Sequence, residues 1–252
     1  MVPSVLRSVK ATRYVTPLRE GGSLPGLVEA DDDGLYVCKF RGAGQGEKAL
    51  IAEVIAGELA RAAGLTLPEI VTVELDPALG AAEPDPEIQD LINASAGTNV
   101  GLDFLPGSLP FSPAGGFAPE PELAADIVWI DALVSNVDRT PRNPNLLVWH
   151  GRLWLIDHGA ALYHHHREWD PAVEAGKPFA GIGDHVLLGL AGSIAEADER
   201  LAGRLTPAVV EAAVAAVPGG WADGVPYSDY LRRRLVAPRA FAEEAERARV
   251  AA

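Results

Sequence analysis

The stretch VSNVDRTPRNPNLLVWHGRLWLIDHG, residues 134–159, is the most informative part of the chain, because a polar loop is followed there by two short apolar runs. The runs LLVW, 146–149, and LWLI, 153–156, are rich in strand-forming side chains, and the glycine-containing sequence between them is typical of a tight turn. We therefore expect a hairpin in which the second run folds back along the first.

Three oxygen-bearing side chains are expected to converge at one end of this hairpin. Asp138 and Asn143 belong to the polar loop before it, and Asp157 follows its second strand directly. Magnesium prefers oxygen ligands and is usually held by one or two carboxylates together with substrate phosphates, so this set suits that ion. A simpler alternative is that Asp138 and Asn143 only satisfy backbone groups in a proline-containing loop and that Asp157 caps a turn.

The chain upstream of the loop is β-rich and contains one long helix. We predict an antiparallel meander over 12–40, an amphipathic helix over 46–64, a strand over 69–76, an acidic surface loop over 77–89, and a strand with a turn over 98–107. The helix is inferred from apolar residues that recur at helical spacing and from the glycine that follows them.

The chain downstream is mainly helical. The segment 109–122 is crowded with Pro and Gly and is the predicted boundary between the two halves. A helix is predicted over 122–135, before the polar loop, and further helices from about residue 169 to the end. Because strands and helices do not alternate regularly, their order argues against a doubly wound sheet and against an α/β barrel. The expected class is α+β with two lobes.

The composition limits the partners of the protein. The chain has 252 residues, with 21 Lys and Arg against 35 Asp and Glu, so its net charge is -14. A chain this acidic is not expected to bind nucleic acid or a membrane surface, and no stretch approaches the roughly 20 apolar residues of a membrane span. Cys38 is the only cysteine, which excludes an intrachain disulfide and a cysteine-based zinc cluster and fits a cytoplasmic protein.

The polar loop and the hairpin resemble the catalytic and metal-binding loops of protein-kinase-like folds. The shared pattern is Asp, four residues, Asn, and then a strand pair that ends in Asp-x-Gly, here DRTPRN at 138–143 and DHG at 157–159. The sequence is most similar to the HipA-like kinases, which share features with phosphatidylinositol kinases. The resemblance implies that Asp138 orients or deprotonates the attacking hydroxyl, that Asn143 binds magnesium, and that Asp157 bridges the metal to the phosphates.

Two residues depart from the common kinase pattern. His158 replaces the Phe of the usual Asp-Phe-Gly, and Asn145 is a second candidate ligand two residues beyond Asn143. The five-residue spacing from Asp138 favours Asn143, and Asn145 is kept as the alternative.

The resemblance extends upstream to YVCKF, where Lys39 would contact the α- and β-phosphates of ATP and be restrained by a glutamate of the next helix. A lysine in an apolar strand can instead extend its amino group to solvent. The family pattern selects Glu53 as the partner, through the LARAAGLTLP ending that follows it. Helical periodicity points to Glu58, because at about 100° per residue Glu58 lies inside the apolar arc and Glu53 outside it. We predict Glu53 and keep Glu58 as the alternative.

Three weaker signals complete the predicted site. Gly22 and Ser23, in EGGS, are expected to approach phosphate oxygens, although an ordinary hairpin turn explains them equally well. Phe104 and Leu105, in DFLPGS, lie where kinase-like folds have the hinge that binds adenine, or they belong to a plain turn. The adjacent side chains of 164–166, all histidine, point in different directions, so we predict a structural role for them rather than a shared metal.

By this resemblance the protein is expected to be a kinase that uses ATP and Mg2+ to phosphorylate a hydroxyl of a protein Ser or Thr or of a small molecule. A β-rich nucleotide-binding lobe would span residues 1–107 and a mainly helical catalytic lobe residues 108–252. Two alternatives stay open, a nucleotide-binding pseudokinase or regulatory module and an adenylyl transferase on the same fold. The presence of the lysine and of the loop Asp and Asn residues counts against the pseudokinase.

Overall fold

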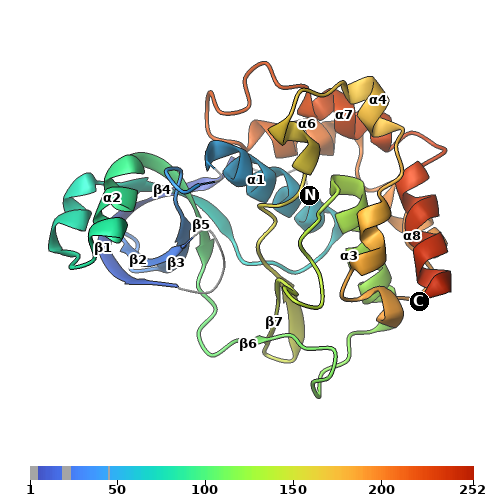
Figure 1. Ribbon diagram of the computed structural model, residues 1–252, viewed down its shortest axis with the longest axis horizontal. Coiled ribbons are helices and arrows are strands. Elements are labelled where there is room, and N and C mark those ends of the chain that lie inside the picture. Colours follow the sequence, from blue (N-terminus) through green and yellow to red (C-terminus); the bar gives the residue numbers. More distant parts are fainter. Residues whose placement is uncertain (1–4, 19–23, 45) are drawn as a thin grey trace.

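The computed structural model describes residues 5–18, 24–44 and 46–252. A five-stranded barrel lies on one side of the molecule and most of the helices lie on the other, as Figure 1 shows. The predicted α+β class is confirmed, with two sheets and eight α-helices in the described ranges. None of the helices in these ranges is both long enough and apolar enough to cross a membrane.

Five strands close into the barrel in the order β1-β2-β3-β5-β4. They are β1 (Arg7–Pro17), β2 (Gly26–Ala30), β3 (Leu35–Lys39), β4 (Ile70–Leu75) and β5 (Gly97–Asp103). Neighbouring strands are antiparallel except β1 and β4, which pair in parallel and close the barrel. Alternate side chains point inward, so Val28, Cys38 and Val73 are fully buried in a small separate core. The predicted meander is confirmed by the pairing of β1, β2 and β3.

The remainder of the chain contains a hairpin and six helices. β7 (Leu146–Trp149) and β8 (Arg152–Leu155) form the predicted hairpin, and β6 (Leu109–Pro110), inside the Pro- and Gly-rich segment, pairs with β7. The helices are α3 (Pro121–Val134), α4 (Pro171–Ala175), α5 (Ile194–Leu201), α6 (Pro207–Ala215), α7 (Tyr227–Arg234) and α8 (Ala240–Ala251), and short 3-10 helices lie at Tyr163–His166, Ala180–Asp184 and Leu188–Leu190. Helix α3, with Trp129 fully buried, is central to the larger core.

Helix α1 (Gly46–Ala63) lies between the barrel and the other helices (Figure 1). The residue that follows it, Gly64, has a φ of 98°, a conformation that favours glycine. Every residue from 50 to 60 is buried, so the helix is covered around its whole circumference and the predicted amphipathic pattern is wrong for this part. Packing is close on the barrel side, because a Cβ on Gly57 would overlap Cδ1 of Ile70 in β4.

One predicted loop is partly helical. The segment 77–89 contains a 3-10 helix (Pro77–Ala82) and the start of helix α2 (Pro86–Ala94). The Asp85 side chain accepts a hydrogen bond from a backbone N–H of the first turn, and a proline occupies the first helical position. Ile88 and Ile92, one turn apart, are buried against the barrel core. The loop prediction is wrong because the acidic and proline residues that indicate a loop also form the start of this helix.

Candidate functional site

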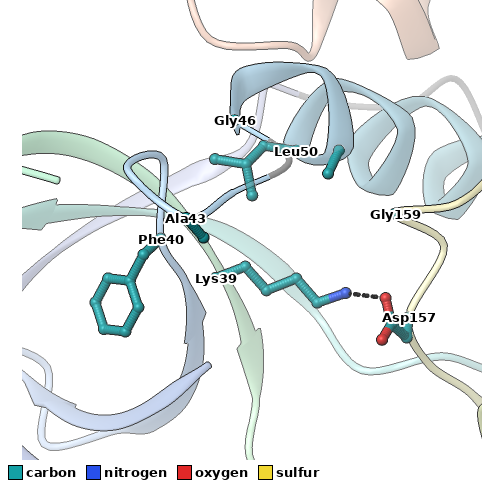
Figure 2. Close-up of a pocket in the computed structure, with 8 residues that line it drawn as sticks. Lys39, Phe40, Ala43, Gly46, Leu50, Asp157 and Gly159 are labelled. Atoms are coloured by element: carbon teal, nitrogen blue, oxygen red, sulfur yellow. Dashed lines mark hydrogen bonds and ion pairs between the residues drawn. The ribbon is translucent and has the colours of Figure 1, made fainter. Parts of the chain in front are cut away.

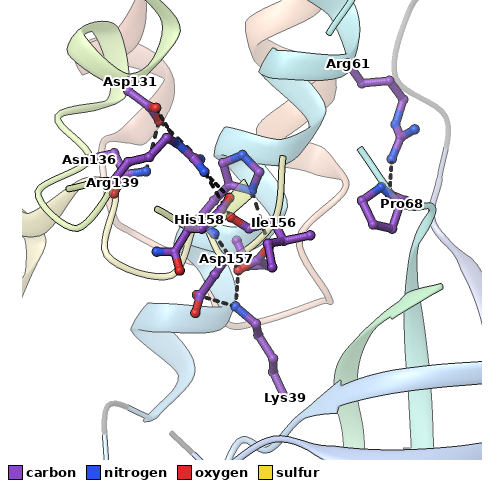
Figure 3. A network of polar contacts seen from close by, with 11 residues as sticks. Lys39, Arg61, Pro68, Asp131, Asn136, Arg139, Ile156, Asp157 and His158 are labelled. Atoms are coloured by element: carbon purple, nitrogen blue, oxygen red, sulfur yellow. Dashed lines mark hydrogen bonds and ion pairs between the residues drawn. The ribbon is translucent and has the colours of Figure 1, made fainter. Parts of the chain in front are cut away.

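A lysine and two carboxylates meet where the barrel faces α1. Lys39 is the last residue of β3, and its Nζ lies 2.5 Å from Oε2 of Glu53 in the middle of α1. The same Nζ lies 2.5 Å from Oδ1 of Asp157, two residues after β8 (Figure 3). Lys39 therefore contacts Glu53 and not Glu58, which instead pairs with Arg61 at 3.2 Å. Three segments that are distant in the sequence share one cluster.

Charge compensates for burial in this cluster. Burial lowers the pKa of Lys39, but the carboxylates of Glu53 and Asp157 outweigh burial and raise that pKa above its ordinary value. Burial raises the pKa of Glu53, but the ammonium of Lys39 and the hydrogen bond from His158 bring it down to about 2. Lys39 and Glu53 are therefore both charged at neutral pH, although neither is freely hydrated.

Asp157 is the accessible member of the cluster. Its side chain is 40% exposed, whereas that of Lys39 is 11% exposed and that of Glu53 is fully buried. The backbone of Asp157 has a φ of 54°, in the left-handed region that is uncommon for residues other than glycine and that recurs at functional sites. The following backbone N–H, of His158, donates to Glu53 at 2.9 Å and holds this turn in place. Asp157 can therefore exchange Lys39 for another cation while Glu53 keeps Lys39.

A small pocket opens beside Lys39 and Asp157 (Figure 2). It is lined by Lys39, Phe40, Ala43, Gly46, Ala49, Leu50, Asp157 and Gly159. Its wall includes the start of α1, where the first backbone N–H groups of a helix have no partner within the helix and favour an anion. A cationic side chain and a helix N-terminus at one pocket indicate a site for a negatively charged ligand.

Asp138 and Asn143 contact each other in the loop between α3 and β7. Nδ2 of Asn143 donates to Oδ2 of Asp138 at 2.6 Å, and Nδ2 of Asn145 donates to the same oxygen at 3.3 Å. Each amide uses its nitrogen in this way, which leaves its carbonyl oxygen as an acceptor for a cation. Asn143 is exposed and Asn145 is buried, so Asn143 is the more accessible of the two candidate ligands.

A buried ion pair supports this loop from the side of α3. Nε of Arg139 lies 2.5 Å from Oδ2 of Asp131, and both side chains are fully buried (Figure 3). Nε2 of His185 lies 3.0 Å from the same oxygen, and Asn136 donates to the other carboxylate oxygen at 2.9 Å. Burial raises the pKa of Asp131, but Arg139 and His185 outweigh burial and hold that pKa well below its usual range. All of these partners of the Asp131 carboxylate are therefore buried side chains.

Arg139 also joins the two loops of the candidate site. Its Nη1 donates to the backbone carbonyl of Asn145 and, at 3.2 Å, to that of Ile156, which directly precedes Asp157. The N–H of Ile156 donates to the carbonyl of Asn145 at 3.1 Å. The loop with Asp138 and the turn with Asp157 are therefore held at a defined separation by the Arg139 side chain and by one backbone hydrogen bond.

Sequence reasoning missed Asp131, Arg139 and His185. A single Asp within the apolar run IVWIDALV is a usable signal, because such a residue is almost never buried without a partner. No spacing rule links Asp131 to His185, 54 residues further along the chain. The partner could be found only from the tertiary structure.

Two further residues, Phe104 and Leu105, are predicted to form the hinge that binds adenine. Phe104 and Leu105 follow β5, which pairs with β3. The N–H of Phe104 already donates to the carbonyl of Leu35 at 2.9 Å, so it is not free to bind adenine. Gly22 and Ser23 lie outside the described residues.

Two of the three histidines at 164–166 pack in the protein interior. His164 and His165 are buried, and the ring of His164 lies 4.5 Å from that of Trp169 and 4.4 Å from that of Tyr230. Nδ1 of His165 lies 3.0 Å from the hydroxyl of Tyr227. Burial lowers the pKa of His164 to about 4 and that of His165 to about 3, so both rings are neutral at neutral pH. These contacts agree with the predicted structural role.

The two predicted metal ligands, Asn143 and Asp157, have oxygen atoms that suit magnesium. Asp157 offers an exposed carboxylate and Asn143 an exposed amide oxygen, and hard oxygen ligands of this kind are those that magnesium prefers. Within the described part of the chain, no three His, Cys, Asp or Glu side chains are placed to share a metal. A magnesium ion held by Asn143 and Asp157 would complete its coordination with water or with oxygens of a ligand such as a phosphate.

Comparison with known proteins identifies the fold. Residues 12–173, more than half of the chain, match the family of HipA-like kinases. The solved structure of the Helicobacter pylori proinflammatory kinase CtkA is similar, with a TM-score of 0.53, 11% identity and 98% of each chain covered. The Golgi casein kinase with Mn/ADP bound also has a TM-score of 0.53, with 13% identity, over 98% of this chain and 74% of that one. Identities this low show the fold alone, and no curated protein matches the sequence.

Proposed function

Because the chain belongs to the HipA-like kinase family, we propose that it transfers the terminal phosphoryl group of ATP to a hydroxyl group in a magnesium-dependent reaction. The observation that carries this proposal is the Lys39 ammonium, which is held by buried Glu53 beside exposed Asp157 at a pocket that includes a helix N-terminus. A cation and a helix N-terminus attract phosphate, while the carboxylate attracts the metal that accompanies it. The acceptor is a protein Ser or Thr or a small molecule.

Lys39 is proposed to bind the α- and β-phosphates. The ammonium would leave exposed Asp157 for phosphate oxygens and keep its contact with buried Glu53, which fixes its position. Gly22 and Ser23 are proposed to cover the phosphates. Of the two hinge candidates, Leu105 is the better donor to adenine, because the N–H of Phe104 is already donated within the barrel.

Asn143 and Asp157 are proposed to hold magnesium. Bound there, the ion would neutralise charge on the phosphates and on the group being transferred. The exposed amide of Asn143 is better placed for this than the buried amide of Asn145. Arg139 would keep the two ligands at a constant separation through its contacts with the backbone carbonyls of both loops.

Asp138 is proposed to act at the acceptor. The acceptor oxygen forms a bond to the γ-phosphorus while the bond from that phosphorus to the bridging β,γ-oxygen breaks, and ADP leaves with the electron pair. The hydroxyl proton passes to the carboxylate of Asp138. Asn143 donates to this carboxylate at 2.6 Å and so orients it.

We also propose that the chain forms two lobes that divide near residue 107. The barrel and the helices α1 and α2 precede this point, and the hairpin sheet and α3 to α8 follow it. The cluster of Lys39, Glu53 and Asp157 would then lie between the lobes and depend on their relative position.

The products formed from ATP test the proposed reaction. Incubation of the protein with ATP and magnesium should release ADP, because a phosphoryl group is transferred to an acceptor or slowly to water. Release of pyrophosphate would instead support adenylyl transfer, and tight nucleotide binding with no product would support a pseudokinase. Excess chelator should abolish both turnover and tight ATP binding, and equal affinity with and without chelator would contradict a metal role.

Asp138→Ala tests the assignment of the acceptor group. The variant should keep its affinity for ATP and magnesium, while its single-turnover transfer rate falls by roughly 10² to 10⁴, the contribution of a positioned acid–base group. Asp223→Ala, which removes an exposed carboxylate between α6 and α7, is the matched control and should transfer at the wild-type rate. A wild-type rate in Asp138→Ala would return Asp138 to a structural role in its loop.

A further inference from the structure

His158 takes the place of Phe in the Asp-x-Gly pattern, and its ring is buried against Glu53. Both side chains are fully buried, and Nδ1 of His158 lies 3.3 Å from Oε1 of Glu53. The backbone N–H of the same histidine donates to Oε2 of Glu53 at 2.9 Å. His158 therefore contacts both carboxylate oxygens of Glu53.

The two oxygens of Glu53 have different partners. Oε2 accepts from Lys39 and from the backbone of His158, whereas the ring of His158 is the one partner of Oε1 within the described residues. A phenylalanine ring at this position would leave Oε1 buried without a donor, and a buried unpaired carboxylate oxygen is costly. The Glu53 carboxylate could then rotate away from Lys39 toward another hydrogen-bond donor.

The ring of His158 has no other polar contact in the described part of the chain. Its Nε2 is buried and lacks a hydrogen-bond partner there. Because Glu53 is a carboxylate and only accepts, the proton shared between the two side chains belongs to Nδ1 of the histidine. An apolar ring would fill the same space without burying an unpartnered nitrogen, so the contact with Glu53 is what the imidazole adds.

We infer that His158 is a positioning residue for phosphoryl transfer, which orients Glu53 and thereby holds Lys39 against the phosphates of the nucleotide. His158 acts through Glu53 and does not itself touch the substrate. This inference rests on the proposed function, since it assumes that Lys39 binds the phosphates. It assigns a specific task to the residue by which this chain departs from the common Asp-Phe-Gly.

Two substitutions at His158 separate the hydrogen bond from packing. His158→Phe keeps the ring volume and removes the donor, and it should weaken the affinity for magnesium-bound ADP by about tenfold, the effect of losing one hydrogen bond to a charged group. His158→Asn restores a donor at a similar distance from the backbone and should recover most of the affinity. His164→Phe is the matched control, because His164 is also buried with an unpartnered Nε2, and it should bind the nucleotide as the wild type does.

Combination with Lys39→Met tests the route of the effect. If His158 acts through Glu53 on Lys39, then His158→Phe should change nucleotide affinity less than about twofold when Lys39 is already Met, because coupled residues are not additive. If the two substitutions lower nucleotide affinity by independent factors that multiply in the double variant, the inference is overturned. It is also overturned if His158→Asn binds the nucleotide no more tightly than His158→Phe. If His158→Phe does not fold, His158→Met, a flexible residue without a donor, takes its place in both comparisons.

The same titrations distinguish this inference from the function on which it rests. A wild-type protein that binds no magnesium-bound ADP or ATP would overturn both. A wild type that binds and turns over ATP, with His158→Phe equal to it in affinity, would overturn the role of His158 alone.

Discussion

Two clusters of this protein combine a basic side chain, a carboxylate and a histidine, but they differ in their access to solvent. In the cluster of Asp131, Arg139 and His185 no side chain is more than 2% exposed. The cluster of Lys39 and Glu53 is equally buried at its glutamate but extends to Asp157, whose side chain is 40% exposed. The first cluster is closed and the second is open at one end.

The difference indicates what each cluster can do. In the closed cluster every charge has an internal partner, and Nη1 of Arg139 donates to two backbone carbonyls, so the cluster fixes the shape of two loops. In the open cluster Lys39 can exchange Asp157 for a ligand, because Asp157 is partly exposed and Glu53 keeps a counter-charge on the ammonium. Similar side chains thus stabilise the fold in one place and form the proposed binding site in the other.

The largest expected effect comes from breaking the closed cluster. Asp131→Asn should lower the free energy of unfolding by about 3–5 kcal/mol, because it leaves the fully buried guanidinium of Arg139 without its counter-charge. Urea unfolding measures the loss. The control is Glu211→Gln, which breaks an exposed pair with Arg232 and should cost at most about 1 kcal/mol. Equal losses in the two variants would contradict the distinction between the clusters.

The second-largest effect is expected at Glu53, the buried carboxylate of the open cluster, when the pH is lowered. The pKa of Glu53 is lowered from 4.5 to about 2 in the folded protein, so its contribution to stability is complete above pH 4.5 and is lost as the pH falls toward 2. At about 1.4 kcal/mol per pKa unit, the contribution is on the order of 3 kcal/mol.

Glu53→Gln isolates this contribution from that of Asp131, which also loses its charge in acid. The free energy of unfolding measured against pH should fall less steeply between pH 4.5 and 2 in the variant than in the wild type. Identical slopes would mean that the negative charge of Glu53 does not stabilise the folded protein.

A smaller loss of stability is expected at the exposed end. Asp157→Asn should change the free energy of unfolding by less than about 1 kcal/mol, because the Asp157 side chain is 40% exposed and Glu53 remains to pair with Lys39. Metal-dependent nucleotide binding should nevertheless weaken, as calorimetry with and without chelator can measure. A large drop in melting temperature without any ligand would show that Asp157 is structural and that both clusters belong to the scaffold.

The smallest effect is expected at Glu58, the second glutamate of α1. Glu58→Gln should cost about 0.5 kcal/mol of stability, because it removes only an ion pair with Arg61 three residues along the helix. Nucleotide affinity should stay at the wild-type value. A loss of affinity in Glu58→Gln, with none in Glu53→Gln, would show that Glu58 and not Glu53 is the functional partner of Lys39.

The sequence predicted those elements whose signals are local. The hairpin at 146–155 follows from two apolar runs and a turn, and the helix that starts at Gly46 follows from apolar spacing and a terminal glycine. The family pattern of the two loops is local as well, so Asp138, Asn143 and Asp157 could be named before any contact was known. The start of helix α2 is also a local signal, but the sequence does not distinguish it from a loop, because Asp85 and the proline after it are typical of both.

Only the tertiary structure decided which charges meet. Periodicity on α1 favoured Glu58 because it assumed a single buried face, whereas α1 is enclosed on all sides and buries Glu53 completely. The contact of His158 with Glu53 spans 105 residues and that of His185 with Asp131 spans 54. A pairing over such distances has no signature in local composition, because it depends on how the barrel, α1 and α3 pack and on which buried groups are then left to satisfy one another.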